Sequence, residues 1–300
     1  MTKTSLGFKW KTLGGKQFWT DQHHCGGWRI QKNAVTGHCR LLDAENRRHL
    51  SGSAEACHSE LNQLVANGSV RQIEGRVVIV LHGLIRTTNS MRMLGRFLAD
   101  NSDLTAVDFE YASTRQSVAH HANALAQVIE SFGAGVSEIN FVAHSMGNIV
   151  VRHYLADQLA AGKQEPRFKR MVMIGPPNQG SKFAKVLHRT VLFTWIAGAA
   201  GTELGERWDE LEPRLAIPNF EFGIIAGGQS DKQKLSNFVL DGKDDFTVSV
   251  DEAKLSGATD FLIRPLFHGN MMRKQMTLDA TLCFLENGYF ESLETRNPIE

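Results

Sequence analysis

The chain has 300 residues, of which 42% are hydrophobic and 22% charged, as in an ordinary globular protein of one large domain or two small ones. The formal net charge is +1 at pH 7, so the overall charge does not favour binding to nucleic acid. The sequence has no apolar run long enough to span a bilayer, no secretory-type N-terminus and no framework spacing of its four cysteines. We therefore expect reduced thiols and a cytoplasmic location.

Residues 1–70 are expected to form an N-terminal extension made of a β-hairpin and a helix. Residues 17–50 carry aromatic and alternating side chains, with a hairpin-type connection at 33–37. A capped helix is expected over residues 53–66.

Residues of metal-ligand type gather in this extension. They are His23, His24, Cys25, His38, Cys39, Cys57 and His58. No Cys-x-x-Cys or His-x-x-x-His pair holds two of them in register, so we favour ordinary residues of a β segment over a structural zinc site.

Strand-like and helical patterns alternate over residues 71–300, which we expect to form the main domain. Strands are expected at residues 76–81, 104–109, 139–143, 170–174, 220–226 and 261–264. Helices are expected at residues 91–100, 117–131, 146–161 and 270–287. This alternation indicates an α/β fold, with a mostly parallel sheet flanked by helices.

Residues 181–217 interrupt the alternation. An apolar stretch that includes Leu192, Trp195 and Ile196 is followed by glycine-rich residues 198–205. The pattern predicts a helical insertion, either as part of the core or as a lid-like wall beside a substrate site. The three named side chains are our candidate substrate-binding residues.

The segment Ala143-His144-Ser145-Met146-Gly147 lies between an apolar strand and a helix. The pattern small-x-Ser-x-Gly is typical of a nucleophile elbow, a sharp strand-to-helix turn that exposes the serine hydroxyl above a sheet. Small residues on either side allow strand and helix to pass closely, and the helix N-terminus favours negative charge. A solvent-exposed turn serine is the alternative, so the assignment depends on its surroundings.

A nucleophilic serine needs a base and an acid, and in this architecture they follow it in the order acid, then histidine. His268 follows the last expected strand and is the only histidine in the last hundred residues, so it is the candidate base. The candidate acid is Asp245, with Asp244 as its near rival and Asp241 and Asp251 less favoured.

The developing oxyanion needs two N–H donors. One is expected from Met146, which follows the serine, and the other from Leu84, in the loop after the first long strand. Gly83 lets that loop approach closely, and His82 is expected to hold it in place. For Arg86, a solvated loop arginine is favoured over binding of an anionic substrate group.

Five segments resemble the α/β-hydrolase superfamily, most closely its bacterial lipase and esterase branch. They are HGL at 82–84, AHSMG at 143–147, GPPNQGS at 175–181, DDFTV at 244–248 and FHG at 267–269.

This resemblance covers about residues 76–290 and implies the site roles residue by residue. It implies Ser145 as nucleophile, Asp245 as acid, His268 as base, and the N–H groups of Leu84 and Met146 as the oxyanion hole. Two positions depart from the family pattern. Ala143 stands where glycine is commoner, and Phe246 stands where glycine is typical, which keeps Asp244 open as the acid.

We therefore expect a serine hydrolase that cleaves carboxylic esters of acyl or hydrophobic substrates through an acyl-enzyme, as a lipase or carboxylesterase does. A thioesterase, amidase or acyltransferase with the same triad is the first alternative, and a non-catalytic binding protein of this fold the second. We expect no metal, no organic cofactor and no nucleic-acid partner. The expected partner is a small-molecule or lipid ester. The aromatic and basic residues near the N-terminus allow transient contact with a membrane surface, but an aromatic edge strand is the simpler interpretation. The sequence predicts no particular oligomeric state.

Overall fold

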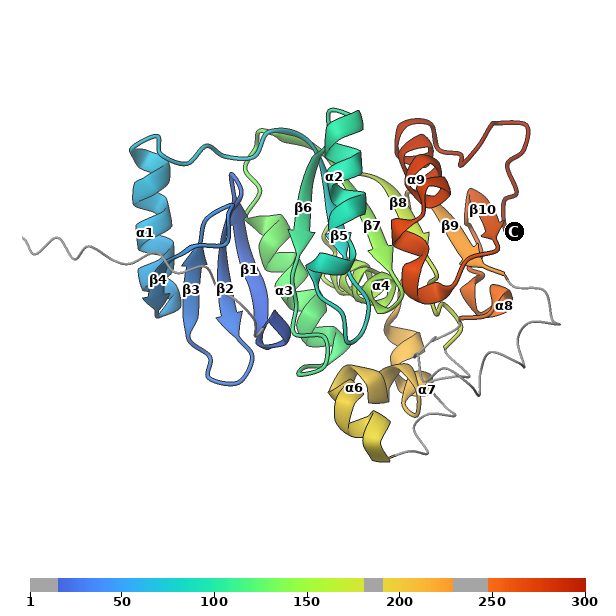
Figure 1. The fold of residues 1–300 in the computed structure, drawn as a ribbon, viewed down its shortest axis with the longest axis horizontal. Coiled ribbons are helices and arrows are strands. Elements are labelled where there is room, and N and C mark those ends of the chain that lie inside the picture. The colour runs from blue at the N-terminus through green and yellow to red at the C-terminus, as the bar shows by residue number, and fades with distance from the viewer. Residues whose placement is uncertain (1–15, 181–190, 229–247) are drawn as a thin grey trace, which may run out of the picture.

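The computed structural model describes residues 16–180, 191–228 and 248–300 (Figure 1). Its described part contains a six-stranded central sheet and a separate four-stranded sheet. The N-terminal sheet and helix α1 lie on one side of the molecule, and β10 and the C-terminus lie on the opposite side (Figure 1).

The central sheet is parallel, with the strand order β10-β9-β8-β7-β5-β6. Its strands are β5 (Gly75–Leu81), β6 (Thr105–Phe109), β7 (Val136–His144), β8 (Phe168–Ile174), β9 (Glu221–Gly227) and β10 (Asp260–Arg264). The strands β5 and β7 lie inside the sheet, and each finishes with an unbroken run of buried residues, as expected where helices cover both faces of a sheet. The predicted α/β class and parallel sheet are confirmed.

Two pairs of helices bury the two faces of this sheet. They are α2 (Arg92–Asn101) with α9 (Gln275–Asn287), and α3 (Val118–Glu130) with α4 (Met146–Ala160). Each pair contributes its apolar side chains to one of the two large core clusters, so the sheet forms the middle layer of three.

The C-terminal helix α9 is shorter than the sequence predicts. Residues 270–287 were expected to form one helix, but the chain first makes the 3-10 helix η4 (His268–Arg273). Lys274 then adopts an extended conformation, with φ −89° and ψ 133°, so α9 begins only at Gln275. This break gives the segment that follows His268 a direction different from that of α9.

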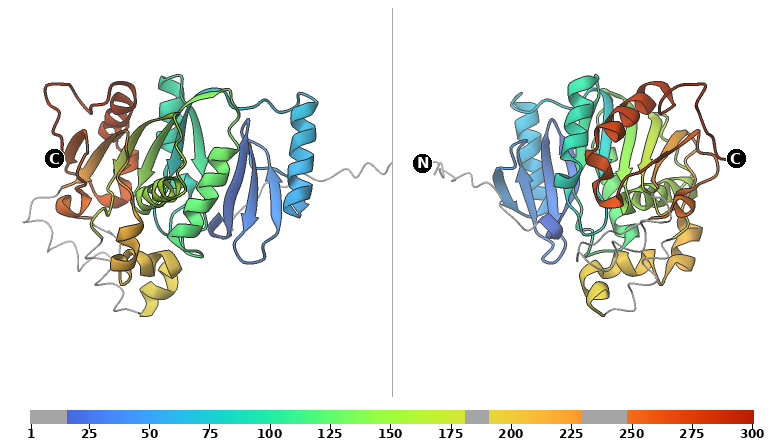
Figure 2. Two further views of the ribbon diagram at one scale, coloured as in Figure 1. Left: turned by 180° about the vertical axis from the view of Figure 1, so that it is seen from behind. Right: turned by 45° about the vertical axis from the view of Figure 1, so that its right-hand side comes forward.

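The helical insertion is present in the part that the structure describes. It comprises α6 (Val191–Leu204), α7 (Trp208–Leu211) and the 3-10 helix η3 (Glu212–Arg214), which lie together at one end of the molecule (Figures 1 and 2). Gly198 bends α6 with φ 63°, and a Cβ there would lie 1.8 Å from the Thr114 carbonyl oxygen. The second half of the insertion is therefore fixed against the loop after β6.

The N-terminal sheet is antiparallel and has the order β1-β2-β3-β4. Its elements are η1 (Lys16–Phe18), β1 (Trp19–Cys25), β2 (Trp28–Asn33), β3 (Cys39–Leu42), β4 (Arg48–Gly52) and α1 (Ala54–Ala66). The β-hairpin expected in the N-terminal extension is present, and it belongs to a sheet separate from the central one. The sheet builds a small core of its own with α1, while β1 packs against α3.

Candidate active site

Ser145 lies at the turn between β7 and α4. Its backbone has φ 53° and ψ −123°, a conformation that costs a non-glycine residue free energy and persists only where the surroundings enforce it. Two interactions enforce it here: the Ser145 N–H donates to the Ile174 carbonyl at 2.9 Å, and the Asn148 side chain donates to the Ser145 carbonyl at 2.9 Å. The predicted elbow geometry is therefore present.

Two glycines let the loop after β5 approach this turn. A Cβ on Gly147 would lie 2.8 Å from the His82 carbonyl oxygen, and a Cβ on Gly83 would lie 3.1 Å from the Ser145 Cβ. Any larger residue at 147 would push the loop and the helix apart. The loop and the elbow are thus in direct contact, as an oxyanion hole requires.

His268 is placed beside the elbow by residues at the ends of two strands, β7 and β8. The His144 Nε2 lies 3.0 Å from the His268 carbonyl oxygen, and the two imidazole rings lie 4.7 Å apart between centroids. Gly175 follows Ile174 and lies against the His268 ring, since a Cβ there would be 2.7 Å from Nδ1. The structure therefore brings together His268 and the strand end that binds the Ser145 backbone.

The electrostatics keep His268 neutral at pH 7. Burial, and then the positive charge of Arg86, lowers the pKa of His268 to about 4. Burial also holds the pKa of His144 well below its usual value, with the nearby His268 and Arg86 adding to the effect. A neutral imidazole is the form that accepts a proton from a hydroxyl.

The loop after β5 contains a second strained residue. Ile85 has φ 61°, in a turn closed by the Arg86 N–H donating to the Gly83 carbonyl at 3.2 Å. Neither the Leu84 nor the Met146 N–H donates to a backbone carbonyl among the described residues. The backbone of the described residues therefore leaves both N–H groups open to another acceptor, and their role as oxyanion donors stays a prediction.

His82 supports this loop. Its Nδ1 lies 2.8 Å from the Gly83 carbonyl oxygen, and its ring stacks on Tyr111 at 4.1 Å between centroids. The Tyr111 hydroxyl in turn donates to the His82 carbonyl. The Thr88 hydroxyl, at the far end of the loop, donates to Glu110 at 2.6 Å. Glu110 and Tyr111 were not singled out from the sequence, although buried polar residues directly after a strand are a usable signal.

The N-terminal segment holds the same region from outside. Asp21 is fully buried, and its carboxylate accepts the Glu110 N–H at 2.7 Å and the Gln31 side-chain amide at 2.7 Å. The Gln17 side chain donates to the Arg86 carbonyl at 2.6 Å. The C-terminal end of the loop after β5 is thus held by residues that precede β2, directly at Arg86 and through Glu110 at Thr88.

The segment after β8 ties the elbow helix to α8 (Val250–Ala253). Arg152 of α4 donates to the Asn178 Oδ1 at 3.1 Å, and the Asn178 amide donates to the Ala253 carbonyl at 2.9 Å. This bridge fixes the point where the chain returns after the predicted acid loop.

Of the four candidate acids, the structure describes one, Asp251. Asp245, Asp244 and Asp241 lie outside the described residues. Asp251 is in α8, where its side chain is 88% exposed and forms an ion pair with Lys254 at 2.9 Å. That exposure does not suit a carboxylate that must orient an imidazole.

The predicted substrate-binding residues Leu192, Trp195 and Ile196 fall within α6, and their side chains lie outside the described part. No group of three or more His, Cys, Asp or Glu residues suited to a metal ion occurs among the described residues. Across the same residues, none of the helices combines the length and the apolar character needed to cross a membrane.

The profile of one protein family, described as a domain of unknown function (DUF7379), matches residues 47–205, which is more than half of the chain. No curated protein is similar to the chain in sequence.

Several solved structures share the fold. Lipase BlEst2 of Bacillus licheniformis in its mature form is similar with a TM-score of 0.51 and 15% identity, over 71% of this chain and 92% of that one. Phospholipase PlaB of Legionella pneumophila is similar with a TM-score of 0.51 and 16% identity, over 72% of this chain and 57% of that one. With the strand order and the elbow, these likenesses show the α/β-hydrolase fold.

Proposed function

Because this chain belongs to the DUF7379 family, whose function is unknown, and has the α/β-hydrolase fold, we propose that it is a serine hydrolase of carboxylic esters. Ser145 is the proposed nucleophile, His268 the base and Asp245 the acid. The N–H groups of Leu84 and Met146 are the proposed oxyanion donors.

The proposed reaction proceeds through an acyl-enzyme. The Ser145 Oγ attacks the ester carbonyl carbon while its proton passes to His268, and the two N–H groups stabilise the oxyanion that forms. His268 then gives the proton to the departing alcohol oxygen, which leaves the acyl group on Ser145. A water molecule, deprotonated by His268, attacks this ester and releases the carboxylic acid and the free serine. Asp245 fixes the imidazole tautomer and stabilises its charged form.

One observation supports this proposal most: the strained turn at Ser145 lies between the loop that carries Leu84 and the segment that packs on His268. A serine that only shaped a turn would not need φ 53° beside a buried neutral histidine. The apolar sequence at the start of α6 favours hydrophobic acyl groups.

The test is a p-nitrophenyl ester series of increasing chain length, together with labelling by a fluorophosphonate probe. We expect Ser145→Ala to lose labelling and to lower kcat by about 10³-fold or more. The control is Ser59→Ala at an exposed position of α1, which we expect to keep both the labelling and the turnover of wild type. Equal labelling and turnover in Ser145→Ala and wild type would overturn the mechanism. The chain-length optimum, with matched thioesters and amides, defines the substrate class.

Two matched variants identify the acid. We expect Asp245→Asn to lower kcat by about 10⁴-fold, because the imidazole then takes the wrong tautomer, and Asp244→Asn to have little effect. Loss of activity in Asp244→Asn alone shows that the assignment is wrong while the triad mechanism stands.

A further inference from the structure

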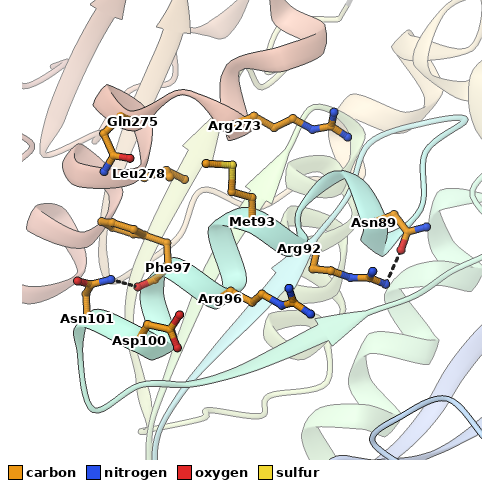
Figure 3. Close-up of a pocket in the computed structure, with 10 residues that line it drawn as sticks. All are labelled: Asn89, Arg92, Met93, Arg96, Phe97, Asp100, Asn101, Arg273, Gln275 and Leu278. Atoms are coloured by element: carbon orange, nitrogen blue, oxygen red, sulfur yellow. Dashed lines mark hydrogen bonds between the residues drawn. The ribbon is translucent and has the colours of Figure 1, made fainter.

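A groove with a volume of about 570 Å³ lies between α2 and α9, on the face of the sheet opposite α3 and α4 (Figure 3). It is lined by Asn89, Arg92, Met93, Arg96, Phe97, Asp100, Asn101, Arg273, Gln275 and Leu278. Neither Ser145 nor His268 lines it. Its size is that of a site for one small molecule.

The charge of this groove is positive and largely uncompensated. Arg92, Arg96 and Arg273 face one carboxylate, Asp100, so the lining carries a net charge of +2. None of the three guanidiniums forms an ion pair within the part of the chain that the structure describes, although Arg92 donates to the Asn89 side chain at 2.5 Å. An excess of like charge along one groove attracts an anion of opposite charge.

The floor of the groove is apolar. Met93 is 49% exposed, Phe97 is half-buried, and the buried Leu278 closes the bottom between the helices. The groove therefore offers guanidinium groups and an apolar surface within one site. Such a site complements a molecule that has an anionic group at one end and an apolar chain at the other.

We propose that this groove binds one molecule of an amphiphile bearing a phosphate monoester. A phosphate monoester carries a charge of about −1.5 to −2 near pH 7, which matches the net charge of the lining, and its oxygens accept paired N–H bonds from guanidinium groups. The phosphate lies between Arg96 of α2 and Arg273 of η4, and the apolar chain lies over Met93, Phe97 and Leu278. The limited volume favours a single dissolved molecule over a membrane surface. This site does not depend on the proposed ester hydrolysis.

The test is isothermal titration of the full chain with decyl phosphate below its critical micelle concentration. We expect saturable one-to-one binding that weakens with added salt, and at least about a tenfold loss of affinity in the double variant Arg96→Gln/Arg273→Gln. Exposed Arg48 and Arg71 lie in the N-terminal part, and the variant Arg48→Gln/Arg71→Gln is the matched control that keeps wild-type affinity.

Three further ligands test each part of the site. Decanol tests the chain alone, inorganic phosphate tests the anion alone, and phosphatidylcholine vesicles with and without phosphatidic acid test a lipid surface. We expect the first two to bind at least about tenfold more weakly than decyl phosphate. Equal binding of decanol, unchanged affinity in Arg96→Gln/Arg273→Gln, or binding to anionic vesicles but not to decyl phosphate would each overturn the proposal.

Discussion

Strained backbone at single residues marks the candidate site more sharply than residue type does. Among the described residues, the positive φ angles outside glycine belong to Asn46, Ile85 and Ser145. Asparagine tolerates this conformation, but a β-branched isoleucine does not. Ile85 follows Gly83 by two residues, and a Cβ on Gly83 would lie 3.1 Å from the Ser145 Cβ, so the strain is concentrated where the proposed oxyanion hole meets the nucleophile.

Gly175 gives a direct test of how closely His268 is held. We expect Gly175→Ala to lower kcat/KM by about tenfold to a hundredfold, because the new Cβ would lie 2.7 Å from Nδ1 and displace the ring. Gly162→Ala is the matched control: Gly162 has φ 64°, close to the 53° of Gly175, but open space where the Cβ would be. Both variants carry the same kind of backbone strain, so equal activity in the two would contradict the proposed position of His268.

At the scale of elements, the N-terminal segment acts as a clamp on the loop after β5. Gln17 bonds to the Arg86 carbonyl, and the Ser113 hydroxyl donates to the Gln17 Oε1 at 3.2 Å. Asp21 bonds to the backbone of Glu110, whose carboxylate accepts from Thr88. A strained loop keeps its shape only if its neighbours over-determine it, and these bonds supply that restraint.

Removing the Gln17 side chain, with its two hydrogen bonds, separates positioning from stability. We expect Gln17→Ala to lower kcat by about tenfold with KM nearly unchanged, because the oxyanion donor near Arg86 is less well held. Its effect on the free energy of unfolding should be about 2 kcal/mol, as for two hydrogen bonds. Gln22→Ala is the control and should keep wild-type kcat, since among the described residues the Gln22 side chain donates to the neighbouring Asp21 carbonyl alone, at 3.2 Å. A parallel loss of kcat and thermal stability in both variants would show a merely structural role.

The sequence predicts the elements well wherever their signals are local. The alternation of strands and helices, the helix cap at Ser53 and the elbow at Ser145 all arise from neighbouring residues, and the structure contains them. The separate packing of the N-terminal sheet depends instead on Asp21 meeting Glu110, which lies 89 positions away. The contact between His144 and His268 spans 124 positions and likewise leaves no local pattern.

At the scale of the whole molecule, some residues of the candidate site lie inside the region that matches the family, and others lie in the segments before and after it. Residues 47–205 include Ser145 and Leu84, whereas His268 comes from the C-terminal third and Gln17 and Asp21 from the N-terminal sheet. The matched region alone therefore lacks the proposed base. We infer that the flanking segments are required for activity and not only for solubility or stability.

Buried neutral histidines also make the whole fold sensitive to acid. His121 of α3 is fully buried, with its ring 4.8 Å from that of Tyr111 between centroids. Burial, and then the nearby His120 and His82, lowers the pKa of His121 to about 3. Between the unfolded value of 6.5 and about 3, the unfolded chain binds a proton that the folded chain does not. Stability is therefore lost as the pH falls through this window, at about 1.4 kcal/mol per pH unit.

Replacing this histidine should flatten the pH dependence of folding. We expect the free energy of unfolding of wild type to fall by about 3 kcal/mol more than that of His121→Gln between pH 8 and pH 4.5, because glutamine does not titrate. Urea unfolding at the two pH values measures this difference. Comparing the two values removes any pH-independent effect of the substitution on the free energy of unfolding. Exposed His38→Gln is the control and should keep the wild-type dependence. An equal fall in wild type and His121→Gln would show that His121 is protonated in the folded state, and hence that its surroundings are more polar than the packing against Tyr111 implies.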